Sequence, residues 1–264
     1  LLVHHIGSGS KFINIQHGGG YGTWQHMVEE DHEKLCSDKF MYWGLNRSVN
    51  PLTKKFDKCL VYLFSLIRRN IRTNKILFLS TMRTMPSIKV LEGPMDELIP
   101  LYYIQQQNFF DTISSDLSGN IYYKPYPSEI VYCSEQLWYQ SANPKKVPLY
   151  CSSFQAAYRN FDLFIYDHHG TGWLESFKAN KPTILVFDST YTHQNEFNET
   201  LISLSKHKFL YNSLSELCTA LDVGLDYFID LWFSYEMQKL RLMIIYSYSP
   251  FGPNYSMVNS YVSN

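Results

Sequence analysis

The sequence lacks the short signatures that mark the most common nucleotide and metal sites. It contains no GxGxxG fingerprint, no GxxxxGK(S/T) loop and no Asp-x-Asp pair. These absences argue against a dinucleotide oxidoreductase, a P-loop nucleotide hydrolase and a metal-dependent nucleotide-sugar site built on an Asp-x-Asp pair.

Long apolar runs and closely spaced cysteines are also absent. The longest apolar run, residues 59–67, has about half of the roughly 18–20 residues that a membrane-spanning helix needs, so we expect it to form a buried helix. The five cysteines form no CxxC pair, and their irregular spacing is typical of reduced thiols in a cytosolic protein. We therefore expect a cytoplasmic protein without a disulfide framework.

Neither sign of charge is in excess. The 264 residues include 23 lysines and arginines and 24 aspartates and glutamates, which gives a formal net charge of −1. Without a global basic field, nucleic acid is not an expected partner. Hydrophobic residues make up 45% of the chain, which is ample for the core of one large domain or two small ones.

What the sequence does contain is an alternation of short apolar runs with helical patterns. Strands are predicted at 12–15, 74–82, 120–127, 161–167 and 183–188, with a short one within 206–213. Helices are predicted within 24–40, 56–69, 95–114, 146–160, 172–180 and 213–222, followed by one long helix over 225–245. Strand–helix alternation at this spacing is typical of parallel βαβ units. The predicted fold class is therefore α/β, with a Rossmann-like, doubly wound parallel sheet.

These patterns divide the chain into four segments. It begins with LLVHHIGSGS, without an initiator methionine or a helix start, and we expect residues 1–50 to be the remnant of a preceding α/β domain. Residues 51–72 are predicted to form a linker and helix, residues 73–230 the Rossmann-like domain, and residues 231–264 a C-terminal crossing helix and tail.

Four loops follow predicted strands, where ligands bind in open parallel sheets. They comprise residues 16–20, 80–83, 124–126 and 167–172. Two of these loops are rich in glycine, one opens a helix, and Arg83 and Lys124 add positive charge. Backbone N–H groups at a helix N-terminus, with cations nearby, form an anion site. We expect a phosphate or diphosphate to bind there.

Two blocks of sequence resemble surface-carbohydrate transferases of GT-B-like fold, a group similar to CDP-glycerol glycerophosphotransferases and capsule and lipopolysaccharide glycosyltransferases. Residues 12–44 resemble the Gln-His-Gly-Gly-rich loop of the family, its Glu-x-x-His-Glu helix (Glu29 to Glu33) and its Trp-Gly turn. Residues 166–188 resemble its helix-opening donor loop, with Gly170, Thr171 and Glu175 at the matching positions. The resemblance extends from about residue 10 to residue 240.

The resemblance implies a two-domain enzyme with its active site between the domains. Residues 1–50 would belong to the acceptor side, and residues 73–230 would bind a nucleotide-activated sugar or polyol donor. The implied function is transfer of a sugar or polyol phosphate from that donor to a glycan or lipid-linked acceptor at the cell surface. A GT-B-fold nucleotide-sugar epimerase and a non-catalytic nucleotide-binding module remain alternatives, and the nucleotide base stays open.

His17 is the candidate catalytic residue, because it follows a strand and could accept a proton from an acceptor hydroxyl as a general base. The alternative is a histidine that only hydrogen-bonds the loop and maintains its shape. Gly18, Gly19, Gly20 and Glu29 are candidate substrate-binding residues. For the three glycines, close approach of substrate to the backbone and a tight turn are both open interpretations.

The candidate donor site combines a loop with two cations. The residues predicted to contact donor phosphate or sugar are Arg83, Lys124, His168, His169, Gly170, Thr171, Gly172 and Glu175. For the loop, the alternative is an ordinary strand–helix turn with Thr171 as its N-cap. The alternative interpretation of Arg83 and Lys124 is that each is an ordinary exposed cation. The alternative for Glu175 is that it is a solvated helix residue. Gly172 departs from the family pattern, where a small hydroxyl residue is more usual.

No cofactor and no metal ion are expected. His26, His32 and Glu33 invite a metal-site interpretation, but the two histidines are six residues apart rather than the four that place two ligands on one helix face. The basic residues Lys239 and Arg241 suggest a peripheral contact with the inner face of the membrane, as for enzymes with lipid-linked acceptors.

Overall fold

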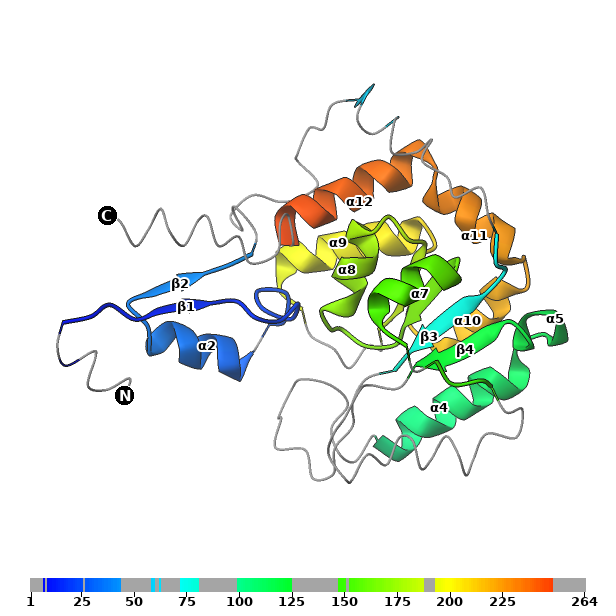
Figure 1. Ribbon diagram of the computed structural model, residues 1–264, viewed down its shortest axis with the longest axis horizontal. Helices are drawn as coiled ribbons and strands as arrows, with labels where there is room; N and C mark the ends of the chain where they lie inside the picture. Colours follow the sequence, from blue (N-terminus) through cyan, green and yellow to red (C-terminus); the bar gives the residue numbers. More distant parts are fainter. Residues whose placement is uncertain are drawn as a thin grey trace.

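The computed structural model describes residues 7, 9–25, 27–43, 58, 59, 62, 72–80, 99–124, 147–150, 152–187 and 193–248. The larger unit is built on a five-stranded sheet in the order β4-β3-β5-β6-β7, in which every neighbouring pair is parallel (Figure 1). The strands are β3 (Ile76–Leu79), β4 (Ile121–Lys124), β5 (Leu163–Tyr166), β6 (Thr183–Val186) and β7 (Leu210–Tyr211).

The central strands are buried on both faces. All four residues of each of β3, β5 and β6 are buried, whereas β4 alternates buried and half-buried positions. Continuous apolar strands of this kind are typical of a parallel sheet that is covered by helices on both sides. The α/β, Rossmann-like, doubly wound fold class is therefore confirmed.

The helices around the sheet form two groups. Helix α4 packs against α10, and α12 packs against α8, α9 and α11 (Figure 1). Their bounds are α4 (Ile99–Thr112), α5 (Ser115–Ser118), α7 (Phe154–Asn160), α8 (Gly172–Lys178), α9 (Asn195–Lys206), α10 (Leu214–Leu221), α11 (Leu225–Trp232) and α12 (Tyr235–Tyr248). None of the helices in the described part of the chain combines the length and apolar character needed to cross a membrane.

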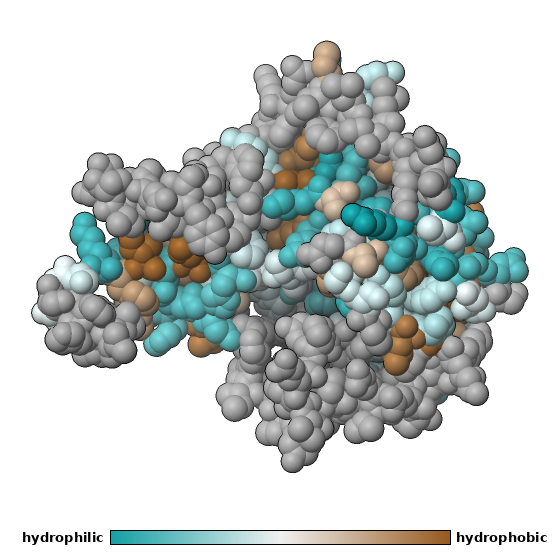
Figure 2. Space-filling view, viewed as in Figure 1, coloured by the Kyte–Doolittle hydropathy of each residue, from teal (hydrophilic) through white to brown (hydrophobic). Residues whose placement is uncertain are grey.

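A smaller N-terminal unit projects from the sheet unit. It consists of strand β1 (Ile13–Ile15), helix α2 (Val28–Leu35) and strand β2 (Lys39–Met41), and the two strands pair in parallel (Figure 1). The strand residues of this unit are half-buried apart from one exposed position, and apolar side chains gather on the face visible in Figure 2. The unit is therefore a second βαβ element beside the main sheet.

Several sequence-based predictions need correction. The helix expected over 24–40 is shorter, and Lys39 and Phe40 belong to β2 instead. Helix α9 was not predicted at all. The long helix expected over 225–245 is two helices, because Ser234 accepts a hydrogen bond from the backbone N–H of Met237 (3.3 Å) and starts a new helix. Most of the helix expected over 56–69 lies outside the described residues, and Lys58, Cys59 and Tyr62 are helical and exposed.

Arg241 does not face a membrane. Its side chain is 2% exposed, and it donates hydrogen bonds to Oε1 of Gln238 (3.0 Å) and to the carbonyl oxygen of Phe177 (2.8 Å). Phe177 lies in the last turn of α8, where a cation interacts favourably with the helix dipole. The expected membrane contact through Arg241 is therefore wrong, since this guanidinium joins α12 to the C-terminal end of α8.

Candidate functional site

The strand order places a topological switch point between β3 and β5. In chain order the sheet reads 2-1-3-4-5, and sheets of this order bind ligands outside the carboxyl ends of the first and third strands. Here those ends are followed by Ser80 and by residues 167–172, which we call the β5–α8 loop. The second of the two glycine-rich loops thus lies at the switch point.

A buried polar cluster anchors the start of the β5–α8 loop. Asp167 is 6% exposed, and its Oδ2 accepts hydrogen bonds from the Tyr102 hydroxyl (2.7 Å) and from Nε2 of Gln106 (2.5 Å). The same two side chains hydrogen-bond the hydroxyl of Ser80. Helix α4 therefore connects the carboxyl ends of β3 and β5. His168 extends this cluster, because its Nδ1 lies 3.4 Å from Oδ1 of Asp167.

The first glycine-rich segment, residues 16–24, reaches directly to the β5–α8 loop. We call this segment the glycine loop. The N–H of Gly19 donates a hydrogen bond to Oγ1 of Thr171 (3.0 Å). A Cβ added at Gly19 would lie 2.9 Å from both the carbonyl oxygen of Gly170 and Cα of Thr171, so only glycine fits this backbone contact. Glycine is thus required at position 19 because another segment approaches its backbone closely. The approaching segment is the backbone of Gly170 and Thr171, and not a substrate.

Thr171 therefore does not act as the helix cap of the alternative interpretation. It occupies the N-cap position of α8, but its side chain makes no capping hydrogen bond and accepts a hydrogen bond from the Gly19 N–H instead.

The glycine at position 172 is explained by packing. A Cβ at this position would lie 2.9 Å from Cε1 of Tyr166, whose hydroxyl donates a hydrogen bond to the Gly172 carbonyl (2.9 Å). A hydroxyl residue would collide with that ring.

The far end of the glycine loop is held next to helix α9. Trp24 forms an antiparallel bridge with His193, and the N–H of Gln194 donates to the carbonyl oxygen of Thr23 (2.9 Å). The Trp24 ring also meets the ring of His169 edge to face, with centroids 5.3 Å apart. The glycine loop is consequently fixed at two points, Gly19 and residues 23–24, against the sheet unit.

His169 is enclosed by aromatic rings. It is 7% exposed, and neither ring nitrogen has a hydrogen-bond partner among the described residues. Its ring contacts are Trp24, Trp173, Phe187, His193 and Phe197. Burial lowers the pKa of His169 well below its ordinary value, and neighbouring His193 and His168 act in the same direction. The imidazole is therefore neutral and brings no positive charge to a phosphate.

Acidification should loosen this part of the structure. Burial lowers the pKa of His193 from 6.5 to about 4, so the unfolded chain binds a proton that the folded chain excludes between these values. Above pH 6.5 His193 is neutral in both states, so it does not affect the pH dependence. As the pH falls from 6.5 towards 4, the free energy of unfolding decreases by about 3 kcal/mol in all, because the unfolded chain binds the proton more strongly. Urea unfolding at pH 7, 5.5 and 4 should show this decline. His193→Phe should make the decline smaller without abolishing it, because buried His169 also excludes a proton in the folded chain. His32→Gln, at an exposed position on α2, should leave the decline unchanged.

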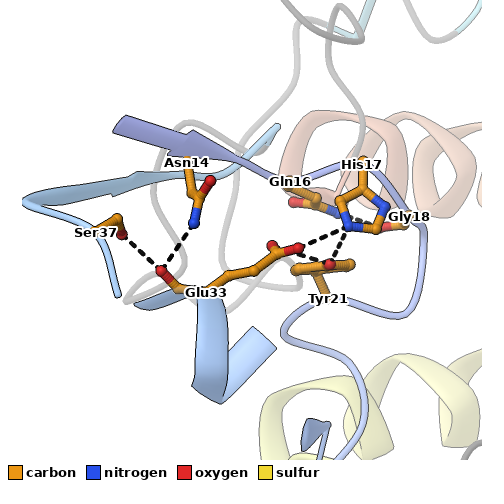
Figure 3. Close-up of polar contacts among 7 residues, drawn as sticks. All are labelled: Asn14, Gln16, His17, Gly18, Tyr21, Glu33 and Ser37. Carbon is orange, nitrogen blue, oxygen red and sulfur yellow. Dashed lines mark hydrogen bonds and ion pairs between the residues drawn. The ribbon is translucent and has the colours of Figure 1, made fainter. Parts of the chain in front are cut away.

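The glycine loop carries His17 into a three-residue polar cluster (Figure 3). Nε2 of His17 lies 2.9 Å from Oε1 of Glu33 and 2.5 Å from the hydroxyl oxygen of Tyr21. The Tyr21 hydroxyl donates to Oε2 of Glu33 (3.0 Å). The His17 side chain is 67% exposed, whereas Glu33 is 25% exposed and Tyr21 is buried. A solvent-accessible imidazole is thus paired with a carboxylate, as in a catalytic base with an orienting acid.

Backbone contacts hold Glu33 and the glycine loop in place. The carbonyl oxygen of Glu33 accepts hydrogen bonds from Nδ2 of Asn14 (3.0 Å) and the hydroxyl of Ser37 (2.7 Å), as Figure 3 shows. Gln16 is buried, and its amide donates to the Gly18 carbonyl (2.7 Å) and accepts from the N–H of Trp43 (3.1 Å). Strands β1 and β2 therefore fix both sides of the His17 cluster.

Glu30, one position from the expected substrate residue Glu29, is structural. It is 2% exposed, and it accepts hydrogen bonds from the N–H of Gly22, the Tyr42 hydroxyl and the ammonium of Lys34. Burial alone would raise the pKa of Glu30, but these three donors outweigh it and lower the pKa. Glu29 itself is half-buried in the first turn of α2.

The remaining predicted residues are more dispersed. Lys124 ends β4, where its ammonium donates to the carbonyl oxygen of Ser152 (2.8 Å) and lies over the rings of Tyr150 and Phe154. Glu175 is exposed on α8. Arg83, His26 and Gly44 lie outside the described residues. Within the described ranges, no group of three His, Cys, Asp or Glu side chains is arranged to hold a metal ion.

Sequence reasoning missed the partners of His17. The sequence indicates Glu33 only as part of a family motif and as a candidate metal ligand, and it gives no indication of a role for Tyr21. The available signal was weak, because Tyr21 follows His17 by four residues in a loop and Glu33 follows by sixteen on another element. Tyr102 and Gln106 were also missed, although their spacing of four places them on one face of a helix.

The fold and site define an α/β protein of the Rossmann-like class, with its candidate site at the carboxyl edge of a parallel sheet. A family model described as LIC12162 family transferase matches residues 1–254. The chain belongs to this family and is therefore a member of a family of transferases.

One similar solved structure is a S. aureus MnaA-UDP co-structure, with 13% sequence identity and a TM-score of 0.38. The match covers 80% of this chain and 50% of that chain, so the chain spans half the length of this structural relative. No curated protein sequence matches the chain.

Proposed function

We propose that the chain transfers a sugar or polyol phosphate from a nucleotide-activated donor to a hydroxyl group of a surface glycan. Membership of a transferase family supports the reaction class. The observation that supports the proposal is the hydrogen bond between Gly19 and Thr171, because it joins the loop bearing His17 to the β5–α8 loop, at the sheet edge where open parallel sheets bind ligands. A candidate base and a candidate donor site thus adjoin.

In this proposal His17 is the general base. Its imidazole takes the proton from the acceptor hydroxyl while the acceptor oxygen attacks the transferred carbon or phosphorus atom. The bond to the nucleotide phosphate breaks, and its electron pair leaves with that phosphate. Glu33, 2.9 Å from Nε2, stabilises the imidazolium that forms and orients the ring.

The donor phosphate is proposed to lie at the β5–α8 loop. Residues His168, Gly170, Thr171 and Gly172 surround the start of α8, and Glu175 lies in its first turn. Positive charge for the departing phosphate comes from Lys124, the last residue of β4, and from Arg83, which follows β3 in the sequence. Residues 73–230 would therefore form the donor-binding domain.

The acceptor is proposed to approach from the N-terminal unit. Gly18, Gly20 and Glu29 lie on the same unit as His17, and residues 1–50 would contribute to the acceptor side. We propose a glycan or lipid-linked acceptor, used in the cytoplasm or at the inner face of the membrane. The reaction requires neither a metal ion nor a cofactor in this scheme.

Product analysis tests the proposed reaction. The chain is incubated with CDP-, UDP- and GDP-activated sugars and CDP-glycerol, with and without hydroxyl acceptors, and the products are resolved by mass spectrometry. We expect release of one nucleotide together with an acceptor whose mass has increased by the transferred group. Conversion of a donor into an isomer without any acceptor would indicate an epimerase, and binding without turnover would indicate a non-catalytic module. Either result would overturn the proposal.

A further inference from the structure

The three contacts among His17, Tyr21 and Glu33 restrict where protons can be. They join Nε2 to Oε1 (2.9 Å), Nε2 to the phenol oxygen (2.5 Å), and the phenol oxygen to Oε2 (3.0 Å). A phenol carries one hydrogen, and a neutral imidazole carries one N–H. Two hydrogens must therefore account for three short contacts.

Only one arrangement gives every contact a proton. If Tyr21 donates to Oε2 of Glu33, the N–H of His17 must be on Nε2, where it faces both the phenol oxygen and Oε1. If Tyr21 donated to Nε2 instead, both carboxylate oxygens of Glu33 would face an unprotonated atom at hydrogen-bond distance. The first arrangement also satisfies the charged acceptor, which forms the stronger bonds.

We infer that Tyr21 and Glu33 hold neutral His17 as the Nε2–H tautomer, so that Nδ1 is the atom that accepts the substrate proton. This inference rests on the proposed role of His17 as a base and specifies its reacting atom. Nδ1 has no hydrogen bond to any described residue, and the ring is 67% exposed. The proton from the acceptor hydroxyl therefore moves to Nδ1, and Nε2 keeps its own.

Tyr21 is suited to this positioning role because its ring is immobilised. It is 1% exposed, stacks on Phe40 with centroids 5.8 Å apart, and meets the His17 ring edge to face at 4.9 Å. Burial raises the pKa of the phenol, and the hydrogen bond to Glu33 raises it further. Tyr21 thus stays protonated and continues to donate to Glu33.

The tautomer can be measured without substrate. In protein labelled with ¹⁵N-histidine, the ring-nitrogen shifts of His17, assigned by comparison with His17→Gln, distinguish Nδ1–H from Nε2–H. We expect Nε2–H in the native protein.

Two variants should change the tautomer. Glu33→Gln offers an amide N–H to Nε2 and should shift the population to Nδ1–H, with turnover lowered by a factor of about 10² to 10⁴. Tyr21→Phe should reduce the Nε2–H fraction and lower kcat about tenfold, with little change in KM.

Tyr42→Phe is the matched control. Tyr42 donates to Glu30 on the same helix, so this variant removes a Tyr–Glu hydrogen bond without touching His17. It should leave the His17 tautomer unchanged. An Nδ1–H tautomer in the native protein, or unaltered shifts in both Glu33→Gln and Tyr21→Phe, would overturn the inference. Full turnover by His17→Gln would instead overturn the proposed function, whichever tautomer is found.

Discussion

Replacing His17 with glutamine lowers the rate of nucleotide release from the donor by a factor of about 10² to 10⁴. A glutamine amide can still donate to Oε1 of Glu33, which lies 2.9 Å from Nε2 in the native chain. It cannot accept a proton at neutral pH. The variant therefore keeps the hydrogen bond that a purely structural histidine would provide and removes only the base. Steady-state kinetics should show the loss in kcat with unchanged nucleotide affinity.

His32→Gln provides the control for this experiment. His32 is exposed on α2, close to Cys36 and outside the His17 cluster, so its replacement should leave turnover unchanged. If His17→Gln retained the native rate, His17 would only maintain the shape of the glycine loop. The proposed mechanism would then be wrong.

Gly19→Ala should destabilise the fold by about 2–3 kcal/mol. The added Cβ would lie 2.9 Å from the carbonyl oxygen of Gly170 and from Cα of Thr171, and backbone atoms cannot move aside as a flexible side chain can. Separating the loops also removes the hydrogen bond from the Gly19 N–H to Thr171. Urea denaturation should show a lower midpoint, and donor turnover should fall because the glycine loop, which bears His17, moves away from the β5–α8 loop.

Gly18→Ala is the matched control for the stability measurement. A Cβ at Gly18 meets only the Tyr21 ring, at 3.5 Å, which is an ordinary van der Waals contact. Its free energy of unfolding should stay close to that of the native chain. Equal stability of the two alanine variants would contradict the close contact between the glycine loop and the β5–α8 loop.

The general location of the candidate site could be predicted from the sequence. Short apolar runs identified β1, β3, β5 and β6, and the carboxyl ends of parallel strands identified the loops that follow them. This local reasoning was sufficient to associate His17 with the end of β1 and residues 167–172 with the end of β5. It needs no knowledge of which distant segments touch.

The contacts that shape the site could not be predicted in the same way. Gly19 meets Thr171 across 152 positions of sequence, and Thr171 reads locally as a helix cap. His169 reads as a phosphate ligand after a strand, but the aromatic rings around it come from several elements. Such roles depend on tertiary packing, which a local pattern does not contain.

Calorimetric titration with CMP, CDP, UDP, GDP and ADP tests the central claim most directly, namely that the chain uses a nucleotide-activated donor at the β5–α8 loop. We expect one nucleotide to bind selectively. Thr171→Trp should abolish the signal, since it fills the loop, and Thr219→Trp, at an exposed position on α10, should leave it intact. Absence of binding by any of the five nucleotides to the folded chain, or binding that Thr171→Trp leaves unchanged, would contradict the account.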